Sequence, residues 1–341
     1  MKNLEKEFNR LVNEKYVYNL AVKVGIGDKV LFEKYASPNG EFDENSMIEV
    51  ASVTKMIVTT SLALVAMTKG LLSKDDLVSK FFPVPDDRKN LTIENVMSHS
   101  IGYGGGNLCL NHVTRENVQD FILNKQMTFT PGERASYSCL AFILLGKIVE
   151  KIFNEDLDTA FKKYVAEPLG MFNSTFNYKG DGHLVNVQRT FESRFLVNDF
   201  NARYLGGMVG NAGLFTCMKD CFTYAQMLLN NGYPIISEEV FKLATKNYSK
   251  HPDDEGRGLG FVYLNKNYPQ TLPLFPDGSI GHAGHTGQSL YIDPVSKLYA
   301  IILSDASNTS YEKMGKGDYN MVIQMRTDLH RAIKLDLENL K

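Results

Sequence analysis

The hydrophobic positions of the chain change their spacing several times. Apolar residues recur at helical intervals over about residues 4–15, and two runs rich in valine, tyrosine and phenylalanine follow at residues 16–24 and 29–35. The Gly25-Ile26-Gly27-Asp28 segment between the two runs is typical of a turn. This pattern predicts an N-terminal helix followed by a β-hairpin.

A long apolar stretch follows the hairpin. Residues 54–69 are almost continuously apolar and precede Gly70, which predicts a buried helix with a glycine stop. Caps and spacing indicate more helices in the middle of the chain, at residues 93–98, 140–153 and 157–165. Strand-like segments return later, at residues 260–264, 289–293 and 298–304, and a final helix is expected at residues 319–337.

Strands near both ends with helices between them predict an α+β fold, in which one sheet is built from distant parts of the chain. We expect a discontinuous sheet subdomain from residues 1–73 and 205–341, and a mainly helical subdomain from residues 74–204. A chain of 341 residues is long enough for a large domain with such an insertion.

Composition and charge exclude several classes of protein. With 43% hydrophobic residues, 22% charged residues and a net charge of -2, the chain lacks the basic character of a nucleic-acid-binding protein. The start, MKNLEKEFNR, alternates charged and apolar residues, unlike a signal peptide, and the apolar runs are too short or too interrupted to span a bilayer. We expect a cytoplasmic protein with no nucleic-acid or membrane partner, although removal of a leader would leave the same sequence.

The four cysteines, Cys109, Cys139, Cys217 and Cys221, show no paired C-x-x-C spacing. Cys217 and Cys221 lie one helical turn apart, where side chains of a core often meet. We expect free thiols in a reducing compartment rather than disulfides or a metal site.

Ser52 and Lys55 are the first candidate catalytic pair. At the start of a helix, residues three positions apart share a face, so the lysine amine can approach the serine oxygen. The apolar run after Lys55 would bury the amine, and burial favours its neutral, basic form. The same pattern also fits an N-cap serine followed by a solvated lysine, so the pair alone does not decide between the two interpretations.

Two further segments carry candidate chemistry. Tyr137 and Ser138 follow a Pro-Gly turn and precede a long apolar helix, where a tyrosine is either a core aromatic or a hydrogen-bonding group. The glycine-rich segment GHAGHTGQSLYID, residues 281–293, leaves a strand backbone open to a peptide-like partner. His282 and His285 within it could be metal ligands, but no acidic residue or cysteine with ligand spacing accompanies them.

The order of these motifs resembles the family of serine beta-lactamases and penicillin-binding proteins. A Ser-x-x-Lys motif opens a helix, a Tyr-Ser-x motif precedes a helix in the middle insertion, and a His-Thr-Gly motif lies on a late strand. The connecting segments are similar too: LTIENVMSHSIG, FTPGERASYS, EPLGM and GNAGLFT. They resemble the branch that holds class C beta-lactamases, soluble D-alanyl-D-alanine carboxypeptidases and related esterases, over about residues 46–305.

The resemblance implies a role for each matching residue. Ser52 is expected to attack an acyl carbonyl and form a covalent acyl-enzyme, while Lys55 and Tyr137 share the transfer of its proton. The sequence leaves open which of these two is the base. The backbone amides of Ser52 and Gln288 are expected to form the oxyanion hole. Neither a metal nor an organic cofactor is expected.

The resemblance also implies a substrate-binding wall at His285, Thr286 and Gly287, with Thr286 placed to bond a carboxylate or carbonyl group. Two residues depart from the family pattern. Cys139 replaces an asparagine that binds the substrate amide, and a thiol is a poor substitute for a group that both donates and accepts hydrogen bonds. His285 replaces the usual lysine and holds an anionic substrate less well, because an imidazole is mostly neutral at neutral pH. Both exchanges argue against efficient hydrolysis of beta-lactams.

The implied fold is a mainly antiparallel sheet, covered by the terminal helices on one face and by the nucleophile helix on the other, with the active site between the two subdomains. The implied function is a serine hydrolase of esterase or peptidase type that acts on a small ester, amide or peptide. The alternatives are a D-alanyl-D-alanine carboxypeptidase, a weak beta-lactamase, an acyltransferase, or a non-catalytic sensor of a peptide or beta-lactam. The oligomeric state is not determined by the sequence.

Overall fold

A six-stranded antiparallel sheet forms the centre of the computed structural model, which describes residues 1–38, 40–106, 108, 113–176, 196–268, 274–307 and 319–339. The strand order is β2-β1-β8-β7-β6-β5, so two N-terminal strands join four C-terminal ones. The strands are β1 (Leu20–Ile26), β2 (Lys29–Ala36), β5 (Val262–Tyr263), β6 (Ile280–Ala283), β7 (Ser289–Ile292) and β8 (Leu298–Ser304). The predicted α+β fold with a sheet built from distant segments is confirmed.

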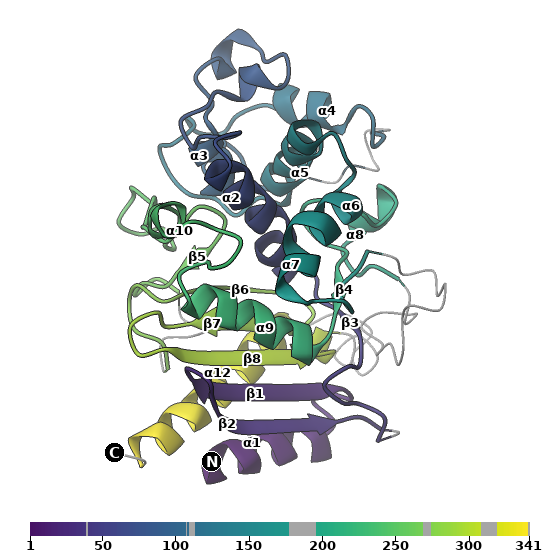
Figure 1. The fold of residues 1–341 in the computed structure, drawn as a ribbon, viewed down its shortest axis with the longest axis vertical. Helices are drawn as coiled ribbons and strands as arrows, with labels where there is room; N and C mark the ends of the chain where they lie inside the picture. The colour runs from purple at the N-terminus through teal and green to yellow at the C-terminus, as the bar shows by residue number, and fades with distance from the viewer. Residues whose placement is uncertain are drawn as a thin grey trace.

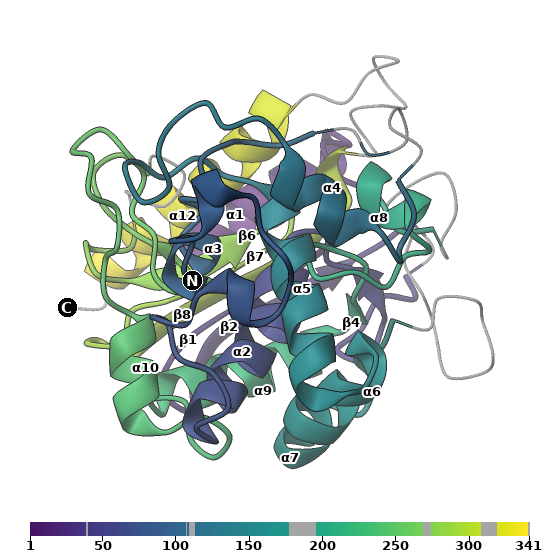
Figure 2. The same cartoon turned by 90° about the horizontal axis from the view of Figure 1, so that it is seen from above.

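Helices cover both faces of this sheet. Seen from above, α1 (Lys2–Asn13) and α12 (Tyr319–Glu338) lie on one side and α9 (Met218–Leu229) lies on the other (Figure 2). Alternate residues of β8 serve the two sides, because Ile302 packs with the terminal helices and Ile301 packs into the opposite core. The terminal helices thus cover the expected face. On the other face α9 contacts β7 and β8 directly, and the nucleophile helix joins the same core.

The remaining helices pack above the sheet in Figure 1, where a pair of two-residue strands links them to it. This pair consists of β3 (Ile48–Glu49) and β4 (Phe215–Thr216). The helices are α2 (Ser61–Thr68), η2 (Val78–Lys80), η3 (Asp86–Arg88), α3 (Ile93–Met97), α4 (Val118–Asn124), α5 (Cys139–Phe153), α6 (Leu157–Phe161), η5 (Lys162–Ala166), α7 (Glu167–Leu169), α8 (Phe200–Tyr204) and α10 (Glu238–Ala244). None of the described helices is both long and apolar enough to cross a membrane.

The helix predicted at residues 54–69 begins with an unexpected π-helical segment. Residues Lys55–Thr60 form η1, and α2 continues the helix to Gly70, which adopts the left-handed φ of 70° that the glycine stop predicts. Wider π turns weaken the regular ladder of backbone bonds. Two side chains contact the Met56 carbonyl within this segment: Ser61 Oγ donates to it at 3.2 Å and Tyr224 Oη at 2.9 Å. Neighbouring side chains therefore stabilise the helix that carries Lys55.

A pair of glycines lets the backbone beside this helix approach α5 very closely. A Cβ atom on Gly146 would lie 3.0 Å from Gly210 Cα, and one on Gly210 would lie 2.1 Å from the Phe142 carbonyl oxygen. The Gly210 carbonyl in turn accepts a hydrogen bond of 2.7 Å from Thr59 Oγ1. Gly210 is therefore held between α5 and the nucleophile helix, where no side chain fits.

The Gly210→Ala variant should test this contact. Because the added methyl group meets backbone rather than a flexible side chain, we expect the free energy of unfolding to fall by at least about 2 kcal/mol. Chemical denaturation measures the loss. The matched control is Gly105→Ala, whose Cβ would have no atom within 4 Å, and which should change stability by less than about 0.5 kcal/mol. Equal stability of the two variants would contradict the proposed steric contact.

Candidate active site

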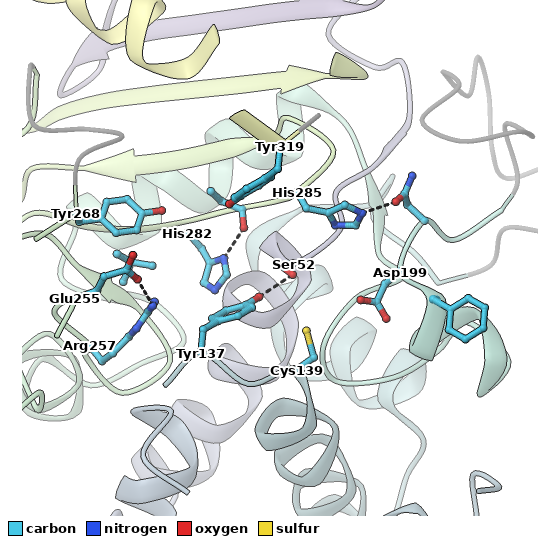
Figure 3. A pocket seen from close by; sticks show the side chains of 14 residues that line it. Ser52, Tyr137, Cys139, Asp199, Glu255, Arg257, Tyr268, His282, His285 and Tyr319 are labelled. Carbon is cyan, nitrogen blue, oxygen red and sulfur yellow. Dashed lines mark hydrogen bonds and ion pairs between the residues drawn. The ribbon is translucent and has the colours of Figure 1, made fainter. Parts of the chain in front are cut away.

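Ser52 and Tyr137 meet where the helical part of the chain faces the sheet (Figure 3), and Lys55 joins them through a hydrogen bond to Ser52. Lys55 Nζ donates to Ser52 Oγ at 2.9 Å, and Tyr137 Oη donates to the same oxygen at 2.8 Å. Ser52 lies in the turn before η1, Lys55 is the first residue of η1, and Tyr137 precedes α5. Folding therefore brings together the three residues predicted to be catalytic from segments 85 positions apart.

The Lys55 amine is completely buried and has three neighbours that accept from it. Besides Ser52, Nζ donates to the Asn211 carbonyl at 2.9 Å and to Cys139 Sγ at 3.5 Å. Burial acts to lower the pKa of Lys55, but the negative charges that Cys139 and Tyr137 can carry outweigh it, and the net pKa lies above the usual range. Lys55 is therefore an ammonium group in the resting site.

The Tyr137 phenol is also protonated at rest. Burial raises its pKa to about 12, and the nearby Lys55 charge partly opposes this shift. Lys55 and Tyr137 both donate to the Ser52 oxygen, so the charge of each group influences the protonation of the other.

Two residues to which the sequence assigned no function hold the Tyr137 ring. The His99 ring lies 4.8 Å from it between centroids, and the Arg257 guanidinium lies 5.6 Å from its centre. His99 Nδ1 accepts a 3.1 Å hydrogen bond from the Ser138 amide, and burial lowers the pKa of His99 well below its usual value. The His99 imidazole is thus a neutral support for the tyrosine. His99 lies inside the LTIENVMSHSIG segment, which was the only sequence signal for it.

The His-Thr-Gly motif lies in a turn rather than on a strand, which corrects the sequence prediction. Residues 284–287 connect β6 and β7, and the turn is closed by a 2.8 Å hydrogen bond from the Gly284 amide to the Gln288 carbonyl. Gly287 has a φ of 125°, a backbone conformation that residues with a side chain disfavour. The turn therefore requires a glycine at this position. Within the described ranges, the backbone amides of Ser52 and Gln288 donate to no protein acceptor, as an oxyanion hole requires.

The Gln288 side chain fixes this turn to the nucleophile segment. Its Nε2 donates to the Glu49 carbonyl at 3.0 Å and to the Ser304 carbonyl at 2.8 Å, and its Oε1 accepts from Thr286 Oγ1. Buried Arg326 of α12 donates to the Gln288 carbonyl at 3.1 Å from the other side. Thr286 is buried with its hydroxyl engaged, so the substrate contact expected of it is not prepared in this structure.

A pocket of about 630 Å³ opens over Ser52. Of the predicted binding residues, Cys139 and His285 line it, whereas Thr286 and Gly287 do not. The other lining residues are Asn198, Asp199, Phe200, Glu255, Arg257, Val262, Tyr268, Ala283 and Tyr319. The first five belong to the loops at residues 181–201 and 251–257, which the sequence suggests as substrate walls without assigning a role to any single residue.

The histidines of the pocket are neutral. Burial lowers the pKa of His282 to about 3, and burial also lowers the pKa of His285 although Asp199 opposes that shift. His282 Nδ1 donates to the Ala283 carbonyl at 2.9 Å, and His285 Nε2 bonds to Asn198 Oδ1. In the part of the chain that the structure describes, no group of three or more His, Cys, Asp or Glu residues could hold a metal ion.

The thiols show no disulfide among the described residues. Cys139, Cys217 and Cys221 are free, and the last two are buried beside the start of α9. Cys109 lies outside the described residues.

Glu49 lies directly behind the nucleophile and is fully buried. Its Oε1 accepts from the Ala51 amide at 2.9 Å and its Oε2 from the Asn198 amide at 3.4 Å. Desolvation raises the pKa of this carboxyl to about 8, although these amide bonds act to lower it. One carboxyl group therefore joins the Ser52 turn to the pocket wall at Asn198. No sequence pattern indicated this residue.

Comparisons with known proteins agree with this geometry. A family model described as Beta-lactamase matches residues 4–319. A protein of Salmonella typhimurium named "Putative D-alanyl-D-alanine carboxypeptidase" is 30% identical over 301 residues, which cover 76% of this chain and 69% of the relative.

Two solved structures have a similar fold. EstCE1, described as a hydrolase with promiscuous acyltransferase activity, has a TM-score of 0.76 at 18% identity, with 96% of this chain and 98% of that chain covered. The octameric penicillin-binding protein homologue from Pyrococcus abyssi has a TM-score of 0.71 at 22% identity, with 92% and 77% covered. At these identities the likeness concerns the fold alone.

The Glu49→Gln variant should reveal the buried carboxyl through the pH dependence of stability. The folded protein holds a proton on Glu49 between the ordinary pKa of 4.5 and about 8, where the unfolded chain has released it. The free energy of unfolding of the wild type therefore falls as pH rises through this window. The variant does not titrate there, so its stability relative to wild type should improve by on the order of a few kcal/mol from the acidic to the basic end.

Chemical denaturation at both ends of the window measures this change. The exposed control Glu44→Gln should keep the pH dependence of the wild type. Parallel stability curves for wild type and Glu49→Gln would show that Glu49 does not titrate in this range.

Proposed function

Because the chain belongs to the beta-lactamase family, we propose that it is a serine hydrolase that cleaves a small ester or amide through a covalent acyl-enzyme. The observation that supports this most is the Ser52 oxygen, which lies within hydrogen-bond distance of both Lys55 and Tyr137 at the edge of an open pocket. A nucleophile, a proton acceptor and an orienting cation are the parts that such a reaction needs.

In the proposed acylation step, Tyr137 has first lost its proton to solvent. Ser52 Oγ then attacks the substrate carbonyl carbon, and the serine proton moves to the Tyr137 phenolate oxygen. We assign the base to Tyr137 because the Lys55 ammonium beside it would stabilise the negative charge of a phenolate. The electron pair of the carbonyl bond moves to oxygen, where the amides of Ser52 and Gln288 would hold it. These roles remain proposals for this chain.

The tetrahedral intermediate then collapses. The proton on Tyr137 passes to the leaving oxygen or nitrogen as its bond to the carbonyl carbon breaks, which leaves an ester on Ser52. Water attacks this ester in the second half of the reaction, and Tyr137 acts as base again. Because one group serves both halves, the leaving group and the incoming water should use the same side of the site.

The pocket favours simple esters and amides over beta-lactams. Cys139 is present where an asparagine would bind a substrate amide, and His285 is neutral where a lysine would hold a carboxylate. The carboxypeptidase name of the similar protein keeps a peptide substrate as the second candidate. A sensor without activity is disfavoured because it would not need Lys55 and Tyr137 both bonded to Ser52.

Loss of the nucleophile tests the proposal. A fluorophosphonate probe should add one covalent adduct to the wild type, detected by intact-mass spectrometry, and the adduct should be absent from Ser52→Ala. Hydrolysis of p-nitrophenyl butyrate should fall by about a thousandfold or more in that variant. Ser100→Ala is a matched control on another buried serine. Equal labelling of Ser52→Ala and wild type would refute a Ser52 nucleophile.

Restoring the family residues should shift the substrate preference. In the double variant Cys139→Asn, His285→Lys, an amide and a cation return to the pocket wall, so acylation by the beta-lactam nitrocefin should speed up by about tenfold or more relative to p-nitrophenyl butyrate hydrolysis. Stopped-flow absorbance measures acylation for both proteins. An unchanged ratio would show that these two positions do not limit the reaction with beta-lactams.

A further inference from the structure

The charges around the pocket are unevenly balanced. Its lining contains three charged side chains, Asp199, Glu255 and Arg257. Glu255 and Arg257 pair with each other on one side of Ser52. Among the described residues, Asp199 has no ion-pair partner within 4.0 Å. The pocket therefore presents one carboxylate, Asp199, that forms no direct ion pair with any described residue.

Asp199 is held in place by its backbone surroundings. It is the N-cap of α8, and its Oδ1 accepts a 2.8 Å hydrogen bond from the Ala202 amide. No hydrogen bond to Oδ2 is found within the described ranges. Figure 3 shows Asp199 on the His285 side of Ser52, across the pocket from Glu255 and Arg257. Oδ1 thus anchors the side chain, and the described residues leave Oδ2 available to a ligand.

The nearby basic groups do not compensate for this carboxylate. His285 is neutral and already bonds to Asn198 through Nε2. The Lys55 ammonium is buried and directs its protons to Ser52, Cys139 and the Asn211 carbonyl. A positive charge brought by the substrate would therefore find an acceptor at Asp199 that no described group of the protein occupies.

We propose that Asp199 selects substrates whose acyl part carries a protonated amine, such as amino-acid amides or esters with a free amino group. This inference rests on the proposed function, because the proton transfer from Tyr137 to the leaving group decides which part of the substrate faces Asp199. Tyr137 must reach the leaving group, and the Arg257 guanidinium covers the Tyr137 ring. The leaving group then lies on the Arg257 side, and the acyl group lies on the side of Asp199.

A different role for Asp199 would be to stabilise the Lys55 ammonium, since its charge acts to raise the Lys55 pKa. The two roles predict different losses of kcat/KM when the charge of Asp199 is removed. Support of Lys55 would affect every substrate, because each one needs the same proton transfers. Recognition of an amine affects only substrates that carry the positive charge.

Paired substrates separate these roles. D- and L-alanine p-nitroanilide carry an ammonium group where isobutyric p-nitroanilide carries a methyl group of similar size. At neutral pH, wild type should show a kcat/KM for at least one alanine substrate about tenfold or more above that for the isobutyric one. Asp199→Asn should abolish this preference. Asparagine is as good an N-cap as aspartate, so the start of α8 is preserved.

Glu255→Gln is the matched control, because it removes a carboxylate from the opposite side of the same pocket. It should retain the preference for the amine. A wild type that hydrolyses p-nitrophenyl butyrate but shows no amine preference would overturn the inference and leave the proposed function intact. If Asp199→Asn lowers kcat/KM equally for charged and neutral substrates, Asp199 stabilises the Lys55 ammonium and does not recognise the substrate amine. A wild type that turns over none of the substrates would overturn both proposals.

Discussion

The buried Lys55 amine is the constraint on which the rest of the site depends. An ammonium group removed from water is costly unless each of its protons finds an acceptor. Three separate segments provide these acceptors: Ser52, the Asn211 carbonyl and Cys139. The Ser52 hydroxyl, the proposed nucleophile, is therefore oriented by the same bonds that make burial of the Lys55 charge tolerable. A substitution of Lys55 should therefore change both the stability of the fold and the orientation of Ser52.

The Asn211 carbonyl links this constraint to helix packing. It reaches Lys55 because the preceding residue, Gly210, passes against α5 without a side chain. α5 in turn begins at Cys139, which contacts the same amine. A shift of α5 would therefore displace two of the three acceptors at once. Close packing of backbone against backbone in this way gives the site a rigidity that a surface loop would lack.

The sheet contributes through long-range bonds rather than through a motif on a strand. The Gln288 side chain joins the turn after β6 to Glu49, and Glu49 joins the Ser52 turn to Asn198. Arg326 of the C-terminal helix completes this set from the far side of the turn. Oxyanion stabilisation needs its amides held before the substrate arrives, because donors that reorganise during the reaction lose their advantage. The buried polar bonds around Gln288 meet that need.

Elements with a local hydrophobic spacing were predictable from the sequence, whereas residues whose partners lie far away in the chain were not. The helix at residues 140–153 and the hairpin were predictable because their hydrophobic spacing is local, and the order of motifs indicated Ser52, Lys55 and Tyr137. The π-helical start of the nucleophile helix depends on contacts made by Tyr224, which is 168 positions from Met56. Glu49 and His99 have a similar dependence on distant partners. No spacing rule marks such residues, because their environment exists only after folding.

The substrate preference follows from the same distinction. Sequence alone shows that His285 and Cys139 depart from the residues that bind anionic, amide-bearing antibiotics. Under the proposed function, the effect of His285 becomes interpretable with Asp199 in the same pocket, since a neutral imidazole and a carboxylate without an ion-pair partner among the described residues change the local charge in the same direction. Replacement of one cation could be compensated by another nearby, but the described lining offers only Arg257, which is paired with Glu255. In the proposed substrate selection, the neutral His285 and the carboxylate of Asp199 both disfavour anions on the acyl side, whereas Cys139 changes the hydrogen bonding of the pocket without changing its charge.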